Sequence, residues 1–376
     1  MCYFHPMLKL TNIVKETELV SEAAAALRGV LGRVPFVQIK GLERDVRLSD
    51  RGGFRTDILV RLRVAGQSWR LVVDVKREGH PKQVRMAALQ LNDYLSRLPG
   101  SSMYGVVVAP FISERSADVC REAGVGYVDL AGNYRLAFDH VFLETRGAEN
   151  PRRARRDLRS LFSPKAARVL RVLLDGPVRP WKVTDLSAAA RVSLGHVSNV
   201  RKRLLDQEWA AADRTGLRLT RPDDLLHAWG SAYRLSVRAR ETLYTALHGE
   251  RLDAAVRAAL ADAGLGLHLL LASFSAARWL APYARQATTY FFADAVGRAA
   301  VRRHLHLEPA ARGENVVIEE PKDDDVFLAR LEPAPGIWCS GAVQTWLDLS
   351  ASGERGREAA AHLLREKLLP AWRISP

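Results

Sequence analysis

The feature that most constrains this chain is a pair of residue runs, 56–64 and 69–76, in which apolar and polar side chains alternate. A short segment that contains a glycine, residues 65–68, separates them. Because successive side chains of a β-strand point to opposite faces, the two runs predict a β-hairpin with one apolar face. A slip of one residue between the strands would expose half of that face, so the apolar residues fix the register.

The opposite face of the predicted hairpin collects charged side chains. With the turn centred on residues 66–67, Asp57 pairs with Lys76, and Leu59 pairs with Asp74. We therefore expect Asp57, Asp74 and Lys76 to lie within the roughly 5 to 8 Å that separates cross-strand and diagonal neighbours.

Two converging carboxylates and a lysine suit metal-assisted cleavage of phosphodiesters. Mg²⁺, or Mn²⁺ in its place, prefers oxygen ligands and is usually held by one or two carboxylates and a substrate phosphate. Such an ion polarises the phosphate and lowers the pKa of its bound water, which Lys76 would orient or deprotonate. The alternative interpretation is an ordinary ion pair between Asp57 and Lys76 on a solvated face.

Two predicted helices flank the hairpin. In the helix that follows it, Gln90 and Tyr94 lie four positions apart and share a face that can carry polar groups to the hairpin edge. In the alanine-rich helix before it, Glu18 and Glu22 have the same spacing and are candidates for further metal ligands. The alternative for these two glutamates is that they are solvent-facing helix residues.

Asp57, the triplet DVK at residues 74–76 and Gln90 resemble the PD-(D/E)xK restriction-endonuclease-like superfamily, and the resemblance spans residues 10–146. It implies a core of helix, three strands, helix and strand. It also implies that the two acids bind Mg²⁺, that the lysine assists the attacking water and that Gln90 supports the site. Where the family has a proline before the first acid, this chain has Thr56.

Three further segments fit an α/β layer. Residues 103–109 predict a continuous apolar strand, residues 113–123 an amphipathic helix and residues 126–138 a second hairpin. The alternation of strands and helices therefore predicts an α/β fold for this part of the chain.

Length and composition limit the number of domains and the class of protein. At 376 residues and 48% hydrophobic content, the chain can bury substantial cores and is expected to form two or three domains. Three separated cysteines make neither a disulfide framework nor a zinc site, which predicts a reducing cytosol. We find no run of eighteen uncharged apolar residues and no signal-peptide pattern in the sequence, so we expect a cytoplasmic protein without a membrane span.

The formal net charge of +14 is concentrated in one segment. Residues 151–220 hold sixteen Lys or Arg against six Asp or Glu, a net charge of +10 in seventy residues. A surface of this kind displaces counterions from a polyphosphate and predicts steep salt dependence of binding. Arg152, Arg153, Arg155 and Arg156 begin the segment and are expected to link two domains and to follow DNA phosphates.

A helix-turn-helix pattern lies within the basic segment, after a predicted helix at residues 163–174. Thr184 can cap a first helix, and Ser193 can cap a second helix with four apolar residues on its inner side. Those inner residues are Leu194, Val197, Val200 and Leu204. Residues 213–220 follow as a wing, so the segment resembles a winged helix that binds DNA, with a protein-binding winged helix as the alternative. The residues expected to contact DNA are Lys182, Ser193, His196, Ser198, Asn199, Arg201, Lys202, Arg203, Arg214 and Arg218.

The remaining chain gives a weaker pattern. It predicts helices at residues 236–247, 252–263, 273–283 and 355–369 and β-rich segments at residues 315–319 and 343–349. His304 and His306 would share one face of a strand, where they could hold a metal, but no cysteines or placed carboxylates accompany them. The acidic residues 323–325 are expected in a solvated loop.

The winged helix, the strand VQTWLDL and the helix start GERGREAA are similar to AbiEi-type antitoxins of type IV toxin–antitoxin systems, over residues 150–370. In that family such proteins repress their own operon and neutralise a nucleotidyltransferase-like toxin. The resemblance therefore implies an operator and a toxin as partners. The endonuclease-like segment in front departs from the short antitoxin pattern.

The sequence thus predicts an α/β restriction-endonuclease-like core at residues 1–147, a basic linker and winged helix-turn-helix at 148–222 and an α+β C-terminal domain at 223–376. Two functions remain. In the first, a Mg²⁺-dependent endonuclease is loaded on double-stranded DNA by the winged helix, and double-strand cutting would require a homodimer. In the second, a non-catalytic transcriptional regulator or antitoxin uses the winged helix at an operator. Paired acids beside a basic DNA surface repel phosphate unless a cation neutralises them, which favours the enzyme.

Overall fold

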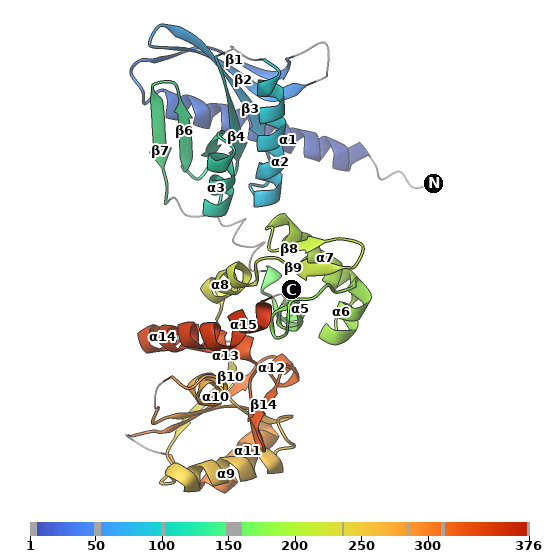
Figure 1. Cartoon of the computed structure of the whole chain (residues 1–376), viewed down its shortest axis with the longest axis vertical. Helices are drawn as coiled ribbons and strands as arrows, with labels where there is room; N and C mark the ends of the chain where they lie inside the picture. The colour runs from blue at the N-terminus through green and yellow to red at the C-terminus, as the bar shows by residue number, and fades with distance from the viewer. Residues whose placement is uncertain are drawn as a thin grey trace. The chain divides into compact units, whose positions relative to one another are not determined.

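The computed structural model describes residues 6–48, 54–98, 102–147, 160–234, 237–283, 286–309 and 313–373, with side chains from residue 16 onward. The chain divides into two compact units: Met1–Leu158 with Asp206–Glu208, and Arg159–Leu205 with Trp209–Pro376. The winged helix and the C-terminal region therefore share one unit (Figure 1). The domain borders at residues 147 and 222 remain a prediction.

The first unit is built on one mixed seven-stranded sheet with the strand order β1-β2-β3-β4-β5-β6-β7. Strands β3, β4 and β5 are parallel, and the other neighbours are antiparallel. Its elements are α1 (Pro6–Leu31), β1 (Val37–Arg47), β2 (Arg55–Val64), β3 (Gln67–Val75), α2 (Pro81–Ser96), β4 (Met103–Ala109), α3 (Glu114–Glu122), β5 (Gly126–Asp129), β6 (Tyr134–Phe138) and β7 (Val141–Thr145). The predicted strand at residues 103–109, the helix at 113–123 and the second hairpin are confirmed.

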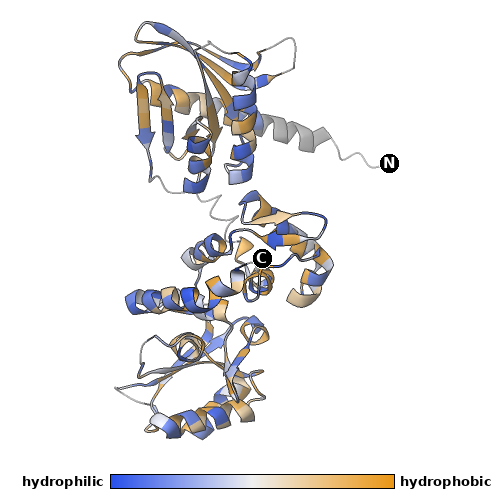
Figure 2. Ribbon diagram, viewed as in Figure 1, coloured by the Kyte–Doolittle hydropathy of each residue, from blue (hydrophilic) through white to orange (hydrophobic). Residues whose placement is uncertain are grey.

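The sheet has an apolar core on each face, because alternate side chains of the central strands point to opposite sides. Ile58 and Val60 pack with α1 on one face, and Leu59 and Val72 pack with α2 and α3 on the other. Figure 1 shows the helices on these two sides of the sheet, and Figure 2 shows apolar and polar residues alternating along the helices that cover it. The predicted α/β layer is therefore present in this unit.

The register of the β2–β3 hairpin differs from the prediction by two residues. Val64 pairs with Gln67 and Leu59 with Val72, so the turn consists of Ala65 and Gly66 alone. Both turn residues have positive φ values, 47° and 92°, as a two-residue hairpin turn requires. A shift of two residues leaves every side chain on its predicted face. The predicted pairs Asp57 with Lys76 and Leu59 with Asp74 are nevertheless wrong.

The second unit begins with the predicted winged helix. Its elements are α5 (Pro164–Leu174), α6 (Val183–Ala190), α7 (Leu194–Asp206), β8 (Ala210–Ala212), β9 (Leu217–Leu219) and α8 (Pro222–Ala232). The two short strands pair antiparallel, and Trp181 adds a bridge to Leu217. Helix α6 begins two residues earlier than expected, at Val183, with Lys182 and not Thr184 in the N-cap position.

The C-terminal region surrounds a six-stranded sheet with the strand order β10-β13-β12-β11-β15-β14. Its strands are β10 (Val237–Leu243), β11 (Leu269–Leu271), β12 (Thr289–Ala293), β13 (Val316–Pro321), β14 (Leu331–Ala334) and β15 (Ile337–Cys339). Its helices are α9 (Gly249–Asp262), α10 (Ser273–Leu280), α11 (Ala295–Leu305), α12 (Asp325–Leu328), α13 (Ala342–Ser350), α14 (Gly353–Leu363), the π-helix η1 (Leu364–Leu368) and α15 (Leu369–Trp372). Among the described residues, none of the helices combines the length and the hydropathy that crossing a bilayer requires.

Two secondary-structure predictions in this region are wrong. The segment 236–247 was expected to be helical, but β10 is a strand whose Arg238 and Arg240 face Glu320 and Glu319 on β13. The segment VQTWLDL was expected to be a strand, but it lies in α13 and all seven residues are buried. A helix that is buried on every side shows no amphipathic stripe, and its sequence therefore lacks the helical period.

Of two predictions about ionisable residues in this region, one is wrong and the other is wrong in part. His304 lies in the last turn of α11, which ends at Leu305, and His306 is its left-handed C-cap, so the two histidines do not share a strand face. Asp325 is 2% exposed and begins α12, where it accepts hydrogen bonds from Arg168 and Arg171. The acidic run was expected in a solvated loop, and Asp323 and Asp324 do lie in a turn before α12 without being buried. Asp325 departs from the prediction, and burial of its carboxylate is possible because two guanidinium groups pair with it.

Candidate functional site

The first candidate site is the acid pair, which we define as Asp57 and Asp74. Asp57 precedes Ile58 and Asp74 follows Val73, and Ile58 and Val73 pair across the hairpin. The two carboxylates therefore lie beside each other, closer than the predicted register would place them. Both side chains are partly buried.

The end of β2 is fixed against β3 by a side chain. Thr56 is 2% exposed, and its Oγ1 donates a hydrogen bond of 2.7 Å to the carbonyl of Val73 and accepts one of 3.1 Å from the Val73 amide. The hydroxyl thus replaces a rung of the backbone ladder at the point where β2 and β3 separate. Asp57 follows directly, and its Oδ2 accepts a hydrogen bond of 2.6 Å from the amide of Val75.

Lys76 completes the group of three residues that the sequence predicted. Its Nζ lies 2.8 Å from Oδ2 of Asp74, and its backbone amide donates a hydrogen bond of 2.7 Å to the carbonyl of Val108 on β4. The ion pair is with Asp74 and not with Asp57, so the solvated Asp57–Lys76 pair of the alternative interpretation does not form. The structure brings all three predicted residues together.

The charges at the acid pair favour the binding of a cation. Burial raises the pKa of the Asp57 carboxyl, and the carboxylate of Asp74 raises it further. The amide of Val75 and the ammonium of Lys76 act in the opposite direction. Two neighbouring carboxylates whose repulsion exceeds the compensation from one lysine suit a divalent cation with oxygen ligands, so the residues fit Mg²⁺ or Mn²⁺.

The sequence also predicted that residues of two helices, Glu18, Glu22 and Gln90, contribute to this site. Glu18 and Glu22 are exposed on α1, and within the described part of the chain no group of three or more His, Cys, Asp or Glu side chains converges. A role of these two glutamates as metal ligands stays a prediction. Gln90 is exposed, whereas Tyr94 on the same helix is buried and stacks on Phe54 with ring centroids 4.3 Å apart. A role for Gln90 stays a prediction.

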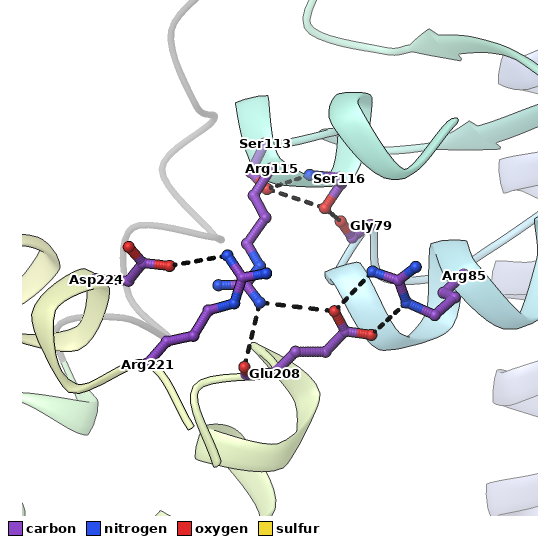
Figure 3. Close-up of polar contacts among 8 residues, drawn as sticks. All are labelled: Gly79, Arg85, Ser113, Arg115, Ser116, Glu208, Arg221 and Asp224. Carbon is purple, nitrogen blue, oxygen red and sulfur yellow. Dashed lines mark hydrogen bonds and ion pairs between the residues drawn. The ribbon is translucent and has the colours of Figure 1, made fainter. Parts of the chain in front are cut away.

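Sequence reasoning missed the contacts that hold the loop after Lys76. A Cβ on Gly79 would lie 2.0 Å from the carbonyl oxygen of Phe111, so only glycine fits there. Ser116 is fully buried, and its Oγ donates a hydrogen bond of 2.7 Å to the Gly79 carbonyl, as Figure 3 shows. Ser113, the N-cap of α3, lies 2.9 Å from the same hydroxyl. The signals in the sequence were Gly79 and, further along the chain, the pattern Ser-x-x-Ser at residues 113–116, where a helix begins.

We predict that the acid pair binds Mn²⁺. Replacement Asp74→Asn removes a ligand charge and is expected to weaken Mn²⁺ binding by about tenfold or more, measured by isothermal titration calorimetry of the full chain. The matched control is Asp93→Asn, an exposed aspartate on α2 that pairs with Arg97. If both variants and the parent bind Mn²⁺ with equal affinity, the acid pair is not the metal site.

The second candidate site is the surface of the winged helix. Val197, Val200 and Leu204 are buried, as predicted for the inner side of α7. The exposed residues among those expected to contact DNA are Lys182, Ser193, Ser198, Asn199, Lys202, Arg214 and Arg218, while His196, Arg201 and Arg203 are half-buried. Arg203 hydrogen-bonds Ser160, and the Nε2 atom of His196 is shielded from solvent. Arg152, Arg153, Arg155 and Arg156 lie outside the described residues.

Hydrogen bonds and a glycine define the turn at the tip of the wing. The carboxylate of Asp213 accepts hydrogen bonds from the amide and the hydroxyl of Thr215, and these bonds lower its pKa. Gly216 has a φ of 138°, and a Cβ there would lie 2.4 Å from the carbonyl oxygen of Trp181. This turn places Arg214 at the exposed tip and Arg218 on the following strand.

A buried polar network joins the winged helix to the C-terminal region. The guanidinium of Arg171 on α5 donates a hydrogen bond of 2.7 Å to Oε1 of Gln344 on α13. Nε2 of Gln344 donates to Oδ1 of Asp348 at 2.8 Å, and the same Oδ1 accepts a hydrogen bond of 2.7 Å from the hydroxyl of Tyr233. Asp175, at the end of α5, accepts a hydrogen bond of 3.0 Å from the amide of Val343.

Two carboxyls of this network titrate far from their usual range. Burial raises the pKa of Asp348 to about 7, and hydrogen bonds from Tyr233 and Gln344 offset only part of the effect. Burial also raises the pKa of Asp175 to about 6. A carboxyl whose pKa is raised in the folded state stabilises the fold at low pH, and this contribution is lost as the pH rises through the folded pKa.

We predict that Asp348→Asn flattens the pH dependence of stability. Between pH 5.5 and 8.5 the parent is expected to lose about 2 kcal/mol of unfolding free energy through this one group, and the isosteric amide cannot ionise. Urea unfolding followed by tryptophan fluorescence measures the change, since seven of the eight tryptophans lie in the second unit. Glu250→Gln, at an exposed carboxylate on α9, is the control. The same pH slope in Asp348→Asn and the parent would contradict the assignment.

Comparison with known proteins finds one family and two solved structures. Residues 218–370 match a family model described as "Transcriptional regulator, AbiEi antitoxin, Type IV TA system". The match covers less than half of the chain and runs from β9 to α15. No curated protein matches the sequence.

The two solved structures are similar to about a third of the chain. One is titled "crystal structure of a repair endonuclease from Pyrococcus abyssi", with 18% identity, 34% of this chain and 48% of that chain covered, and a TM-score of 0.20. The other is titled "Structure of EndoMS in apo form", with 15% identity, 34% and 47% coverage, and a TM-score of 0.20. The match spans about half the length of these structures, and a TM-score this low supports no argument about fold or activity.

Proposed function

We propose that this protein is a DNA-binding transcriptional regulator that serves as the antitoxin of a type IV toxin–antitoxin pair. The observation that carries the proposal is the match of residues 218–370 to the AbiEi regulator family, in a unit that also contains a winged helix with an exposed basic face. In this proposal the winged helix binds an operator in double-stranded DNA, and the C-terminal region binds the toxin.

The winged helix supplies both kinds of contact that DNA binding needs. Helix α7 presents Ser198, Asn199 and Lys202 outward from an apolar inner side, which suits a helix placed in the major groove. Arg214 and Arg218 on the wing are exposed and suit contacts to the phosphates beside the groove. The buried network around Gln344 holds this surface to the C-terminal region, so toxin and DNA would bind the same compact unit.

We predict a specific salt signature for DNA binding. The double variant Arg214→Ala with Arg218→Ala removes two phosphate contacts and is expected to reduce the slope of log affinity against log salt by about 0.9 for each contact. Fluorescence anisotropy with a duplex from upstream of the protein's own gene measures the slope. Arg303→Ala, at an exposed arginine of α11 that pairs with Asp262, is the matched control. An unchanged slope would show that the wing does not touch DNA.

A second candidate function, a Mg²⁺-dependent DNA endonuclease, is favoured by the geometry of the acid pair. Asp57, Asp74 and Lys76 converge on one face, and burial together with the neighbouring carboxylate of Asp74 raises the pKa of Asp57, which a bound cation would offset. A bound divalent cation would polarise the scissile phosphate and activate a water. The carboxylates would hold that ion and Lys76 would orient the water, while the winged helix would hold the duplex.

We predict that any cleavage activity depends on the acid pair. Plasmid and linear DNA incubated with the protein in Mg²⁺ or Mn²⁺ should be cut, and EDTA, Asp74→Ala or Lys76→Ala should each reduce the rate by at least about a hundredfold. Asp93→Ala should leave the rate unchanged. If both strands are cut together, sedimentation on DNA should show a homodimer with two centres. Tight DNA binding without cutting in either metal would leave the regulator as the whole function.

A further inference from the structure

The recognition helix carries an apolar side chain where the sequence predicted none to be exposed. Leu194 was expected on the inner side of α7 with Val197, Val200 and Leu204, which are 0%, 2% and 0% exposed. Leu194 itself is 52% exposed. The reason is its place in the helix. Helical side chains lean toward the N-terminus, so the side chain of the first residue extends beyond the helix end and has no preceding turn to pack against.

The surface around Leu194 is open and otherwise polar. Gly195 has no atom within 4 Å of the place where its Cβ would be. Ser198 and Lys202 follow Leu194 at intervals of four residues, so the three side chains share one face of the helix, and both are exposed. The face therefore runs from an apolar group through a hydroxyl to an ammonium.

The exposed charges of the winged helix indicate a polyanionic partner. Lys182 before α6, Lys202 on α7 and Arg214 and Arg218 on the wing are all exposed. In a helix-turn-helix the N-terminal residues of the second helix contact base edges in the major groove, and the remaining cations contact phosphates. The apolar group that the major groove presents is the C5 methyl of thymine. An exposed leucine at the start of this helix matches that group in position and in chemistry.

We propose that Leu194 determines specificity by packing on a thymine methyl in the major groove, so that the protein prefers an A·T pair at the position it contacts. This inference rests on the proposed DNA binding and adds the chemical group that is read. Loss of one buried methyl group corresponds to about a fourfold change in affinity.

The test removes only the methyl. A duplex is first selected from a random library by binding to the full chain, and it is then resynthesised with deoxyuridine in place of thymidine at each position in turn. Wild-type protein should bind at least one uracil duplex about fourfold more weakly, measured by fluorescence anisotropy. Leu194→Ala should bind the thymine and uracil forms of that duplex equally. Arg214→Ala, the matched control, should weaken both forms and keep their ratio.

The outcomes separate the inference from the function on which it rests. Equal wild-type affinity for thymine and uracil duplexes, or a ratio that Leu194→Ala leaves intact, overturns the role of Leu194 while the regulator stands. Failure of the wild-type chain to enrich any duplex overturns DNA binding itself. The uracil series on wild-type protein requires no variant, so a folding defect in Leu194→Ala would not affect it.

Discussion

The second unit depends on the buried polar contacts of α13. This helix is buried on every side, and its side chains Gln344, Thr345 and Asp348 form hydrogen bonds inside the protein, whereas Nε1 of Trp346 and Oδ2 of Asp348 have no partner among the described residues. Gln344 bonds to Arg171, and Asp348 bonds to Tyr233, which follows α8. Removing one member would leave a buried charge or dipole unpaired, at a cost of about 3 to 5 kcal/mol for a charge. The winged helix is therefore bound to the C-terminal region by contacts that are costly to break.

That constraint explains which parts of the fold the sequence could predict. The β2–β3 hairpin, β4, α3 and the helix-turn-helix each carry their pattern within a few residues, as alternation, continuous apolar runs or helical spacing. The pattern of α13 depends on partners more than a hundred residues away, such as Arg171 for Gln344. Its sequence alternates like a strand only because its polar residues face buried partners. No local rule could have identified it as a helix.

The candidate sites divide in the same way. The faces of the hairpin follow from alternation, so Asp57, Asp74 and Lys76 converge as predicted. The register was wrong because Ala65 has a positive φ, which a residue other than glycine rarely adopts. The hydroxyl of Thr56, which fixes the end of β2 to the backbone at Val73, has no signature in the sequence. Leu194 was misplaced because helical spacing alone does not account for the end of a helix.

The charged groups of the two units have opposite effects on the phosphates of a nucleic acid. The winged helix attracts phosphates through Lys202, Arg214 and Arg218, whereas the acid pair repels them. Burial raises the pKa of Asp57, and the neighbouring carboxylate of Asp74 raises it further. A chain that only repressed transcription would gain nothing from two carboxylates in this arrangement. Thr56 and the Val75 amide nevertheless hold Asp57 beside Asp74. A divalent cation beside Lys76 would offset the repulsion between the two carboxylates, so the affinity of the acid pair for such a cation tests whether the first unit has chemistry of its own.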